Sequence, residues 1–303
     1  MIDFKPITLN EKEIYSSHIA ECGERGCEFS FANLYLWGRQ KYAVLHGHVV
    51  LFSQFNRRTV YPYPVGVGDK KAVLDAIISD AAERGIPCRI TGLNAEARQT
   101  VESLYPNRFR FHCDRDSFDY VYGVEELADL KGKKYHRKRN HFNRFCDKNP
   151  DYTVEEFSYS NIERVREMVG NWYADRLAVD PNADFQMERS ALEKALCDYT
   201  ALGMEGLALI CGGEIVAVTL GSRMSADTFD VHFEKARADV DGAYAAINCE
   251  FARHIRAKYQ DVKFLNREED MGIEGLRKAK ESYYPHHMVE KCWACLLEEG
   301  YEY

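Results

Sequence analysis

The sequence has 303 residues, of which 46% are hydrophobic and 29% charged, and its formal net charge is −8. This composition is typical of a packed globular protein and excludes wholesale disorder, and the length favours two domains. The negative charge argues against general affinity for nucleic acid, so any such contact requires a local basic patch.

The chain shows no targeting or membrane-spanning pattern. Residues 1–13 carry acids and lack a basic region followed by an apolar run, and no stretch approaches the ~20 apolar residues of a membrane span. The ten cysteines are mostly scattered, which indicates reduced thiols rather than a disulfide framework. We therefore expect a cytoplasmic protein.

The first half of the sequence predicts a mixed α/β domain. A helical stretch over 29–40 precedes a hairpin over 41–55 that turns at Gly47, and further strands are predicted over 59–63 and 88–93. Helices are predicted over 69–84, ended by Gly85, and over 94–104, and extended chain follows over 109–122.

The second half repeats this order of elements. Helices near 162–176 and 187–202 precede a hairpin over 206–223 that turns at Gly212 and Gly213, and a strand follows over 227–236. A helix over 242–258, a strand at 261–266, a helix over 273–284 and extended chain over 287–297 complete it. The shared order predicts a duplicated fold.

Several phrases carry a family resemblance: S-F-A-N-L-Y-L-W, L-K-G-K-K-Y-H-R-K-R-N-H-F-N-R-F, H-F-E-K-A with G-A-Y-A-A-I-N, and L-N-R-E-E-D-M-G-I-E-G-L-R-K-A-K-E-S-Y-Y-P. The chain resembles the bacterial family allied to the C-terminal domain of phosphatidylglycerol lysyltransferases. That resemblance implies two tandem GNAT-like α/β domains, each a mixed central sheet flanked by helices. The fold is shared with the Fem enzymes, which take amino acids from aminoacyl-tRNA.

From this resemblance we expect an N-terminal domain over 1–130, a basic connecting helix over 131–150, and a C-terminal domain over 151–303 that carries the site. The acceptor is open among small molecules, peptides and lipid headgroups, and the membrane-spanning portion of the lipid-modifying relatives is lacking.

The segment from Asn266 to Gly272 is the first site candidate, because it follows a predicted strand and leads into a helix. We assign Glu268 and Asp270 to catalysis as proton acceptors, and Asn266 to substrate binding. The alternative is a solvated helix start, where acids suit the helix dipole.

The following helix places Arg277, Lys280 and Tyr284 on one face, with Tyr283 beside them. The family phrase K-x-S-Y-Y-P corresponds to 280–285. We assign Lys280 to catalysis, where its ammonium suits an oxyanion, and the other three to substrate binding. The alternative is an ordinary exposed helical lysine.

His232 and Glu234 are two residues apart on a strand and therefore share one face, where His232 can act as a base near neutral pH. The alternative is a structural histidine. The family phrase G-A-Y-A-A-I-N adds Tyr244 and Asn248 as substrate-binding candidates.

No cofactor is expected, since the acyl-CoA signature is absent. Arg237 is followed at the signature's spacing by Val240 rather than glycine, and Asp239 and Asp241 would repel a pyrophosphate at the start of the next helix. No metal is expected either, because Cys292 and Cys295 lie in a predicted strand, where residues three apart face opposite sides.

A run of cations between Lys131 and Arg144 contains no acid. We expect it to bind a polyanion such as tRNA, although a solvated interdomain helix is the alternative. The residues assigned to this role are Lys133, Lys134, Arg137, Lys138, Arg139 and Arg144.

Together these features predict an aminoacyl-tRNA-dependent transferase that modifies an unidentified amine or hydroxyl. Two alternatives stay open: an acyl-CoA-dependent GNAT acyltransferase, and a non-catalytic binding protein that retains the fold.

Overall fold

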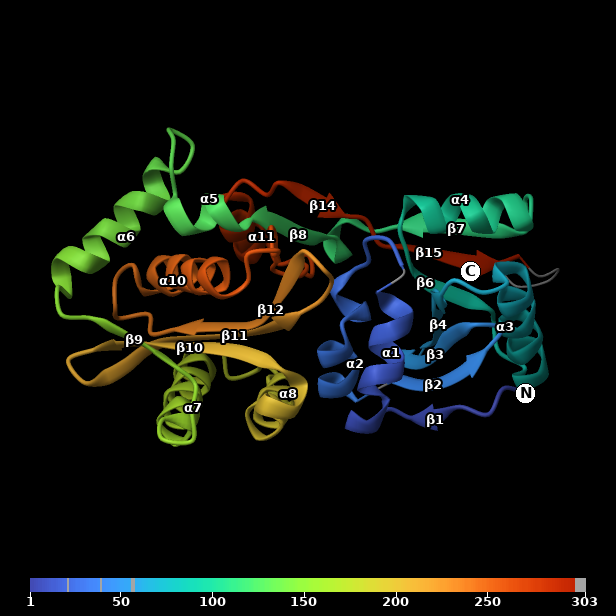
Figure 1. Cartoon of the computed structure of the whole chain (residues 1–303), viewed down its shortest axis with the longest axis horizontal. Helices are drawn as coiled ribbons and strands as arrows, with labels where there is room; N and C mark the ends of the chain where they lie inside the picture. The colour runs from blue at the N-terminus through green and yellow to red at the C-terminus, as the bar shows by residue number, and fades with distance from the viewer. Residues whose placement is uncertain (21, 39, 56–57, 298–303) are drawn as a thin grey trace. The chain divides into compact units, whose positions relative to one another are not determined.

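The computed structural model describes residues 1–20, 22–38, 40–55 and 58–297, which form two compact units (Figure 1). Unit 1 comprises Met1–Asp119, Glu269–Ile273 and the described residues from 288 onward, and unit 2 comprises Tyr120–Glu268 and Glu274–His287. Positions 21, 39, 56, 57 and 298–303 of the expected elements and domains lie outside the described residues.

Unit 1 is built on a mixed sheet whose strands run in the order β1-β2-β3-β4-β6-β15-β7, with β5 paired to β3. The strands are β1 (Lys5–Pro6), β2 (Gln40–Leu45), β3 (His48–Phe55), β4 (Arg58–Pro62), β5 (Val65–Gly66), β6 (Arg89–Leu93), β7 (Phe109–Cys113) and β15 (Cys292–Leu296). The helices are α1 (Lys12–Ile19), α2 (Phe31–Trp37), α3 (Lys70–Arg84) and α4 (Ala95–Leu104).

Unit 2 is built on a seven-stranded sheet in the order β14-β8-β13-β12-β11-β10-β9. Its strands are β8 (Asp119–Gly123), β9 (Thr153–Glu156), β10 (Met204–Cys211), β11 (Glu214–Arg223), β12 (Thr228–Ala236), β13 (Phe264–Asn266) and β14 (His287–Val289). Its helices are α5 (Val124–Asp129), α6 (His136–Lys148), α7 (Ile162–Val179), α8 (Gln186–Cys197), α9 (Tyr199–Leu202), α10 (Ala243–Lys258) and α11 (Glu274–Glu281). Helices α7 and α8 cover one face of this sheet, and α10 covers the other (Figure 1).

The two units differ from the contiguous ranges 1–130 and 151–303 expected from the sequence. The predicted extended segment over 109–122 is divided by a short 3₁₀ turn at Arg115–Ser117, so that β7 joins the sheet of unit 1 while β8 pairs with β13 of unit 2. In the same way the segment over 287–297 divides, and β15 inserts between β6 and β7 of unit 1. Each unit therefore completes its sheet with a strand from the other half of the sequence.

The expectation that the cysteines are reduced thiols is wrong for one pair. Cys113 and Cys292 face each other in the register of β7 and β15 and form a disulfide bond, with their Cα atoms 4.2 Å apart. Strand pairing across 179 positions of sequence brings them together, which spacing along the chain does not reveal. Among the described residues, no helix is long and apolar enough to cross a membrane.

Candidate functional site

Two parallel strands of unit 2 separate at the predicted site. β12 and β13 pair from Thr228 with Phe264 to Asp230 with Asn266, and β12 then continues to Ala236 paired with β11 but not with β13. The register of β11 and β12 also shifts between Gly221 and Leu220, which leaves His232 as the extra residue of a bulge. Because bulges redirect side chains and often lie beside active sites, this backbone makes a defined setting for polar side chains.

Glu234 and Arg267 form an ion pair beside this separation, with Arg267 Nη2 2.9 Å from Glu234 Oε1. The second carboxylate oxygen accepts a hydrogen bond of 3.3 Å from Asn248 of α10. The Arg267 guanidinium also lies 5.6 Å and 5.0 Å from the ring centroids of Tyr122 and Tyr283. Although burial opposes its charge, the carboxylate of Glu234 holds the pKa of Arg267 above its ordinary value. This setting suits Glu234 for positioning neighbouring groups more than for abstracting a proton.

His232 is buried among polar side chains. Its Nε2 is 2.8 Å from Ser222 Oγ, and its Nδ1 is 3.5 Å from Asp230 Oδ2 and 3.4 Å from Glu268 Oε1. The structure thus brings together two predicted catalytic residues, His232 and Glu268, and adds Ser222 and Asp230.

Lys280 is a buried cation that holds the turn after β13. Its ammonium donates hydrogen bonds to the carbonyl oxygens of Arg267 and Glu268, the latter at 3.1 Å. The Tyr122 hydroxyl donates to the carbonyl oxygen of Lys280 at 2.8 Å. The end of α11 is therefore joined to the segment that carries Glu268.

The predicted segment from Asn266 to Gly272 is divided between the two units. Asn266 and Glu268 belong to unit 2, where Asn266 Oδ1 accepts from the Glu268 amide at 2.8 Å. Asp270 belongs to unit 1, where it accepts from the Gly272 amide at 2.9 Å and pairs with Arg115 at 3.4 Å. Asp270 is completely buried in this arrangement, which is that of a structural acid.

The basic segment and the residues that directly follow α11 line one cavity of about 770 Å³ in unit 2. Its lining contains cations, two imidazoles and two hydroxyl groups, and no acid: Lys133, Lys134, His136, Arg137, Lys138, His141, Ser282 and Tyr284. Such a surface is suited to a polyanion.

Two of the six predicted polyanion-binding residues have structural partners instead. Arg139 donates to the carbonyl oxygens of Leu130 and Gly132, and Arg144 pairs with Asp241 at 3.0 Å. Within the described part of the chain, neither lines this cavity.

The remaining candidates lie at different depths. Tyr283 is buried, Tyr284 is half exposed at the cavity, and Arg277 is half buried on α11. The Tyr244 hydroxyl accepts a hydrogen bond of 3.2 Å from Trp172 Nε1, and neither residue is among those that line the cavity. Sequence reasoning missed Arg267, although its position directly after the strand that ends at Asn266 was a usable signal.

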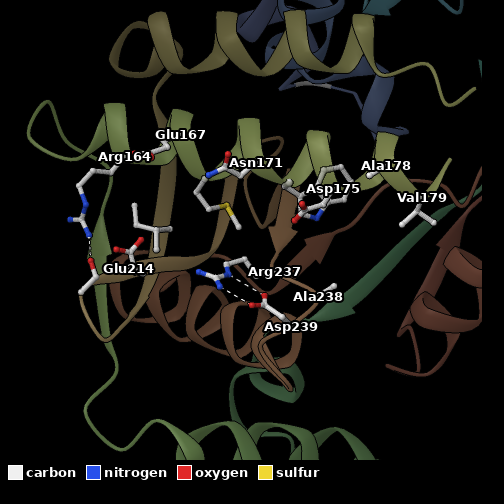
Figure 2. Close-up of a pocket in the computed structure, with 14 residues that line it drawn as sticks. Arg164, Glu167, Asn171, Asp175, Ala178, Val179, Glu214, Arg237, Ala238 and Asp239 are labelled. Atoms are coloured by element: carbon white, nitrogen blue, oxygen red, sulfur yellow. Dashed lines mark hydrogen bonds and ion pairs between the residues drawn. The ribbon is translucent and has the colours of Figure 1, made fainter. Parts of the chain in front are cut away.

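A second cavity of about 740 Å³ lies between α7, the turn from β10 to β11, and the segment after β12. Its two arginines are already engaged: Arg237 pairs with Asp239, and Arg164 donates to the carbonyl oxygen of Gly213 (Figure 2). Glu167, Asp175 and Glu214 add further negative charge, which makes this cavity unsuited to an anionic ligand.

The sequence is similar to one protein family over most of its length. The family model described as the C-terminal region of phosphatidylglycerol lysyltransferase matches residues 19–295. No curated protein matches the sequence.

Solved structures share the fold along nearly the whole chain. A conserved protein of unknown function from Bacteroides thetaiotaomicron is 40% identical, with a TM-score of 0.93, and the match covers 98% of this chain and 100% of that one. L-PGS from Bacillus licheniformis is 17% identical with a TM-score of 0.67, covering 96% and 93% of the two chains. FemX is 12% identical with a TM-score of 0.59, covering 98% of each chain. These likenesses confirm the expected tandem GNAT-like fold.

Proposed function

Because the chain belongs to the family of the phosphatidylglycerol lysyltransferase C-terminal region, we propose that it transfers an amino acid from aminoacyl-tRNA to an amine or hydroxyl acceptor. The observation that carries this proposal is the cationic cavity formed by the basic segment and the residues that directly follow α11. It supports a polyanionic donor beside the helix that bears Lys280. Since aminoacyl-tRNA is a cytosolic substrate, the proposal includes a cytoplasmic location.

The reaction needs little activation of the donor. The acceptor attacks the ester carbonyl carbon, a tetrahedral oxyanion forms, and the ribose oxygen leaves with a proton as the new amide or ester bond is completed. We assign Lys280 to stabilising the oxyanion, because its ammonium is fixed by two carbonyl oxygens. The acceptor's proton is taken up at the group formed by Asp230, His232 and Glu268.

The packing of α6 on α10 supports tRNA over acyl-CoA as the donor. Gly242 caps α10 with φ of 85°, and a Cβ atom there would lie 2.5 Å from the carbonyl oxygen of His141 in α6. Asp241 at this end pairs with Arg144 and Lys148, so both of these cations are already engaged. The first turn of α10, where a GNAT enzyme would hold a pyrophosphate, is therefore covered by α6.

The test is binding of the purified protein to charged tRNA, uncharged tRNA and acyl-CoA across a salt series. The variant Lys133→Gln/Arg137→Gln removes two cavity cations, and Lys71→Gln/Lys263→Gln removes two exposed cations elsewhere. We expect the first variant to weaken tRNA binding about tenfold and to reduce the slope of log K against log salt by about 1.5 to 2, and the control to change neither.

Transfer itself is followed with labelled aminoacyl-tRNA and mixed amine and hydroxyl acceptors. Lys280→Met should reduce label transfer at least about 100-fold while tRNA binding is retained. Binding of acyl-CoA without tRNA would replace this proposal by ordinary acyl transfer. Binding of neither donor would favour a non-catalytic protein.

A further inference from the structure

Three potential metal ligands of unit 2 converge where β12 and β13 separate. Asp230, His232 and Glu268 each offer one ligand atom, and these atoms lie within 4.8 Å of one another. We propose that these three residues bind one divalent transition-metal ion. Nothing in the sequence spacing predicted it, because Asp230 and His232 come from β12 and Glu268 from the turn after β13.

The separations fit a shared ion. His232 Nδ1 is 3.5 Å from Asp230 Oδ2 and 3.4 Å from Glu268 Oε1. Ligands placed about 2.0 to 2.2 Å from a zinc ion in tetrahedral geometry are separated by roughly 3.3 to 3.6 Å. These distances are too long for hydrogen bonds of good geometry, but they suit atoms that coordinate the same cation.

The imidazole is oriented for coordination. His232 Nε2 is 2.8 Å from Ser222 Oγ, and when Nε2–H donates to this hydroxyl, the lone pair resides on Nδ1. The histidine side chain is only 1% exposed, and its Nδ1 has no hydrogen-bond partner among the described residues. A buried ring nitrogen that faces two carboxylates, with the other nitrogen held by a hydroxyl, is the arrangement that metal sites use to orient a histidine ligand.

The backbone fixes the ligands from both sides. The bulge in β12 sets the position of His232, and the chain turns after β13 with Glu268 at φ of 58°. Such a left-handed conformation is costly for a glutamate and is held here by the hydrogen bond from the Glu268 amide to Asn266 Oδ1.

Two other groups of possible metal ligands differ from the group at His232, because a lysine side chain already contacts each of them. In the group of Glu156, Glu205 and His254, Glu205 accepts hydrogen bonds from His254, from Lys258 and from the hydroxyl of Tyr259. A positive side chain therefore already neutralises that cluster.

The group of Cys27, Asp119 and Glu269 in unit 1 surrounds the ammonium of Lys291. The unpartnered buried ring nitrogen thus distinguishes the site at His232 from both.

A mixed imidazole and carboxylate set favours a first-row ion such as Zn²⁺ or Mn²⁺ over Mg²⁺. Three protein ligands leave a position for a water or an acceptor hydroxyl, whose pKa the ion would lower, and the released proton would pass to the oxygen of Asp230 or Glu268 that does not coordinate the ion. This catalytic role rests on the proposed function, whereas metal binding does not depend on it.

Metal binding is tested directly on the full chain. The tag-free protein is stripped with a chelator and titrated with Zn²⁺, Mn²⁺ and Mg²⁺ by calorimetry, and bound metal is counted by elemental analysis after dialysis. We expect one equivalent of Zn²⁺ or Mn²⁺ in the wild type and at least tenfold weaker binding in Glu268→Gln and His232→Gln. Glu156→Gln, from the neutralised cluster, is the matched control and should bind as the wild type does.

Glu268→Gln is the informative variant if His232→Gln does not fold, because the Glu268 side chain is partly exposed. Less than about 0.1 equivalent in the wild type, or unchanged binding in Glu268→Gln, would overturn the site. Stoichiometric metal without aminoacyl transfer would refute only the proposed function.

Discussion

Lys138 lies over the ring of Tyr283, with its Nζ atom 3.8 Å from the ring centroid. Lys138 comes from the basic helix α6, and Tyr283 follows α11, so the contact joins the cationic cavity to the buried pair of Glu234 and Arg267. Burial and the nearby Arg267 lower the pKa of Lys138 to about 8. One cation of the cavity is therefore held in a half-buried, partly desolvated position.

This pKa predicts a pH dependence of stability. Because the pKa of Lys138 is lower in the folded protein than in the unfolded chain, the unfolded chain binds the proton more tightly. The charged Lys138 therefore lowers the free energy of unfolding below pH 8, and this loss is relieved as pH rises toward 10.5. Chemical unfolding of the wild type and Lys138→Met from pH 7 to 10 should show the wild type gaining about 1 to 2 kcal/mol relative to the variant, after allowance for solvent screening. For the exposed Lys133→Met variant, the difference in unfolding free energy from the wild type should not change with pH. If the unfolding free energies of the wild type and Lys138→Met stayed parallel from pH 7 to 10, the assigned pKa would be wrong.

A matched pair of glycines tests how α6 packs on α10. Gly242 and Gly213 have φ of 85° and 86°, but an added Cβ at Gly242 would meet His141 and Phe145, while at Gly213 it would meet nothing within 4 Å. We expect Gly213→Ala to cost about 1 kcal/mol from backbone strain alone, and Gly242→Ala at least about 3 kcal/mol. Urea unfolding measures both, and hydrogen exchange over 136–148 should accelerate only in Gly242→Ala. Equal costs would show that α6 does not constrain this position.

Local patterns were sufficient to predict most elements. The helix expected over 69–84 is α3, capped by the Asp69 side chain on the Ala72 amide and ended by Gly85 in the left-handed region. The hairpin expected at Gly212 and Gly213 is confirmed by the pairing of Cys211 with Glu214. Each prediction depends only on chemistry within a few residues.

The sequence could not predict which strands pair when they lie far apart along the chain. Hydrophobic alternation identifies β8 and β15 as strands but carries no information on which sheet they join, so the divided domains and the disulfide between Cys113 and Cys292 were not predicted. For the same reason Asp270 was grouped with Glu268, although a unit boundary falls between them.

The ion pair of Glu234 and Arg267 predicts strong energetic coupling. Each side chain is nearly buried, so removing one partner leaves an uncompensated charge. We expect Glu234→Gln and Arg267→Met each to cost about 3 kcal/mol, and the double variant to cost about 2 kcal/mol less than their sum. A double-mutant cycle by chemical denaturation measures this coupling. Additive costs would show that the aromatic rings of Tyr122 and Tyr283, rather than Glu234, hold the guanidinium.

A buried cluster in unit 1 predicts the opposite pH trend. The Lys291 ammonium contacts the carboxylates of Asp119, Glu28 at 3.0 Å and Glu269 at 3.2 Å. Burial, with the neighbouring charges of Glu28 and Glu269, raises the pKa of Asp119 to about 7, while Lys291 outweighs burial at Glu269 and lowers its pKa to about 2. One lysine thus neutralises part of the cluster, and a proton on Asp119 neutralises more.

Because the folded pKa of Asp119 exceeds its ordinary value of 3.8, its stabilising protonation is fully present below pH 4 and is lost as pH rises through 7. Relative to Asp119→Asn, the wild type should therefore lose on the order of 3 kcal/mol of unfolding free energy between pH 4 and 8. Denaturant titrations at several pH values measure the difference, and the exposed Asp3→Asn variant should follow the wild type throughout. If the unfolding free energy of the wild type instead rose relative to that of Asp119→Asn with increasing pH, Lys291 would be keeping Asp119 ionised. The proton assigned here to Asp119 would then be held elsewhere in the cluster.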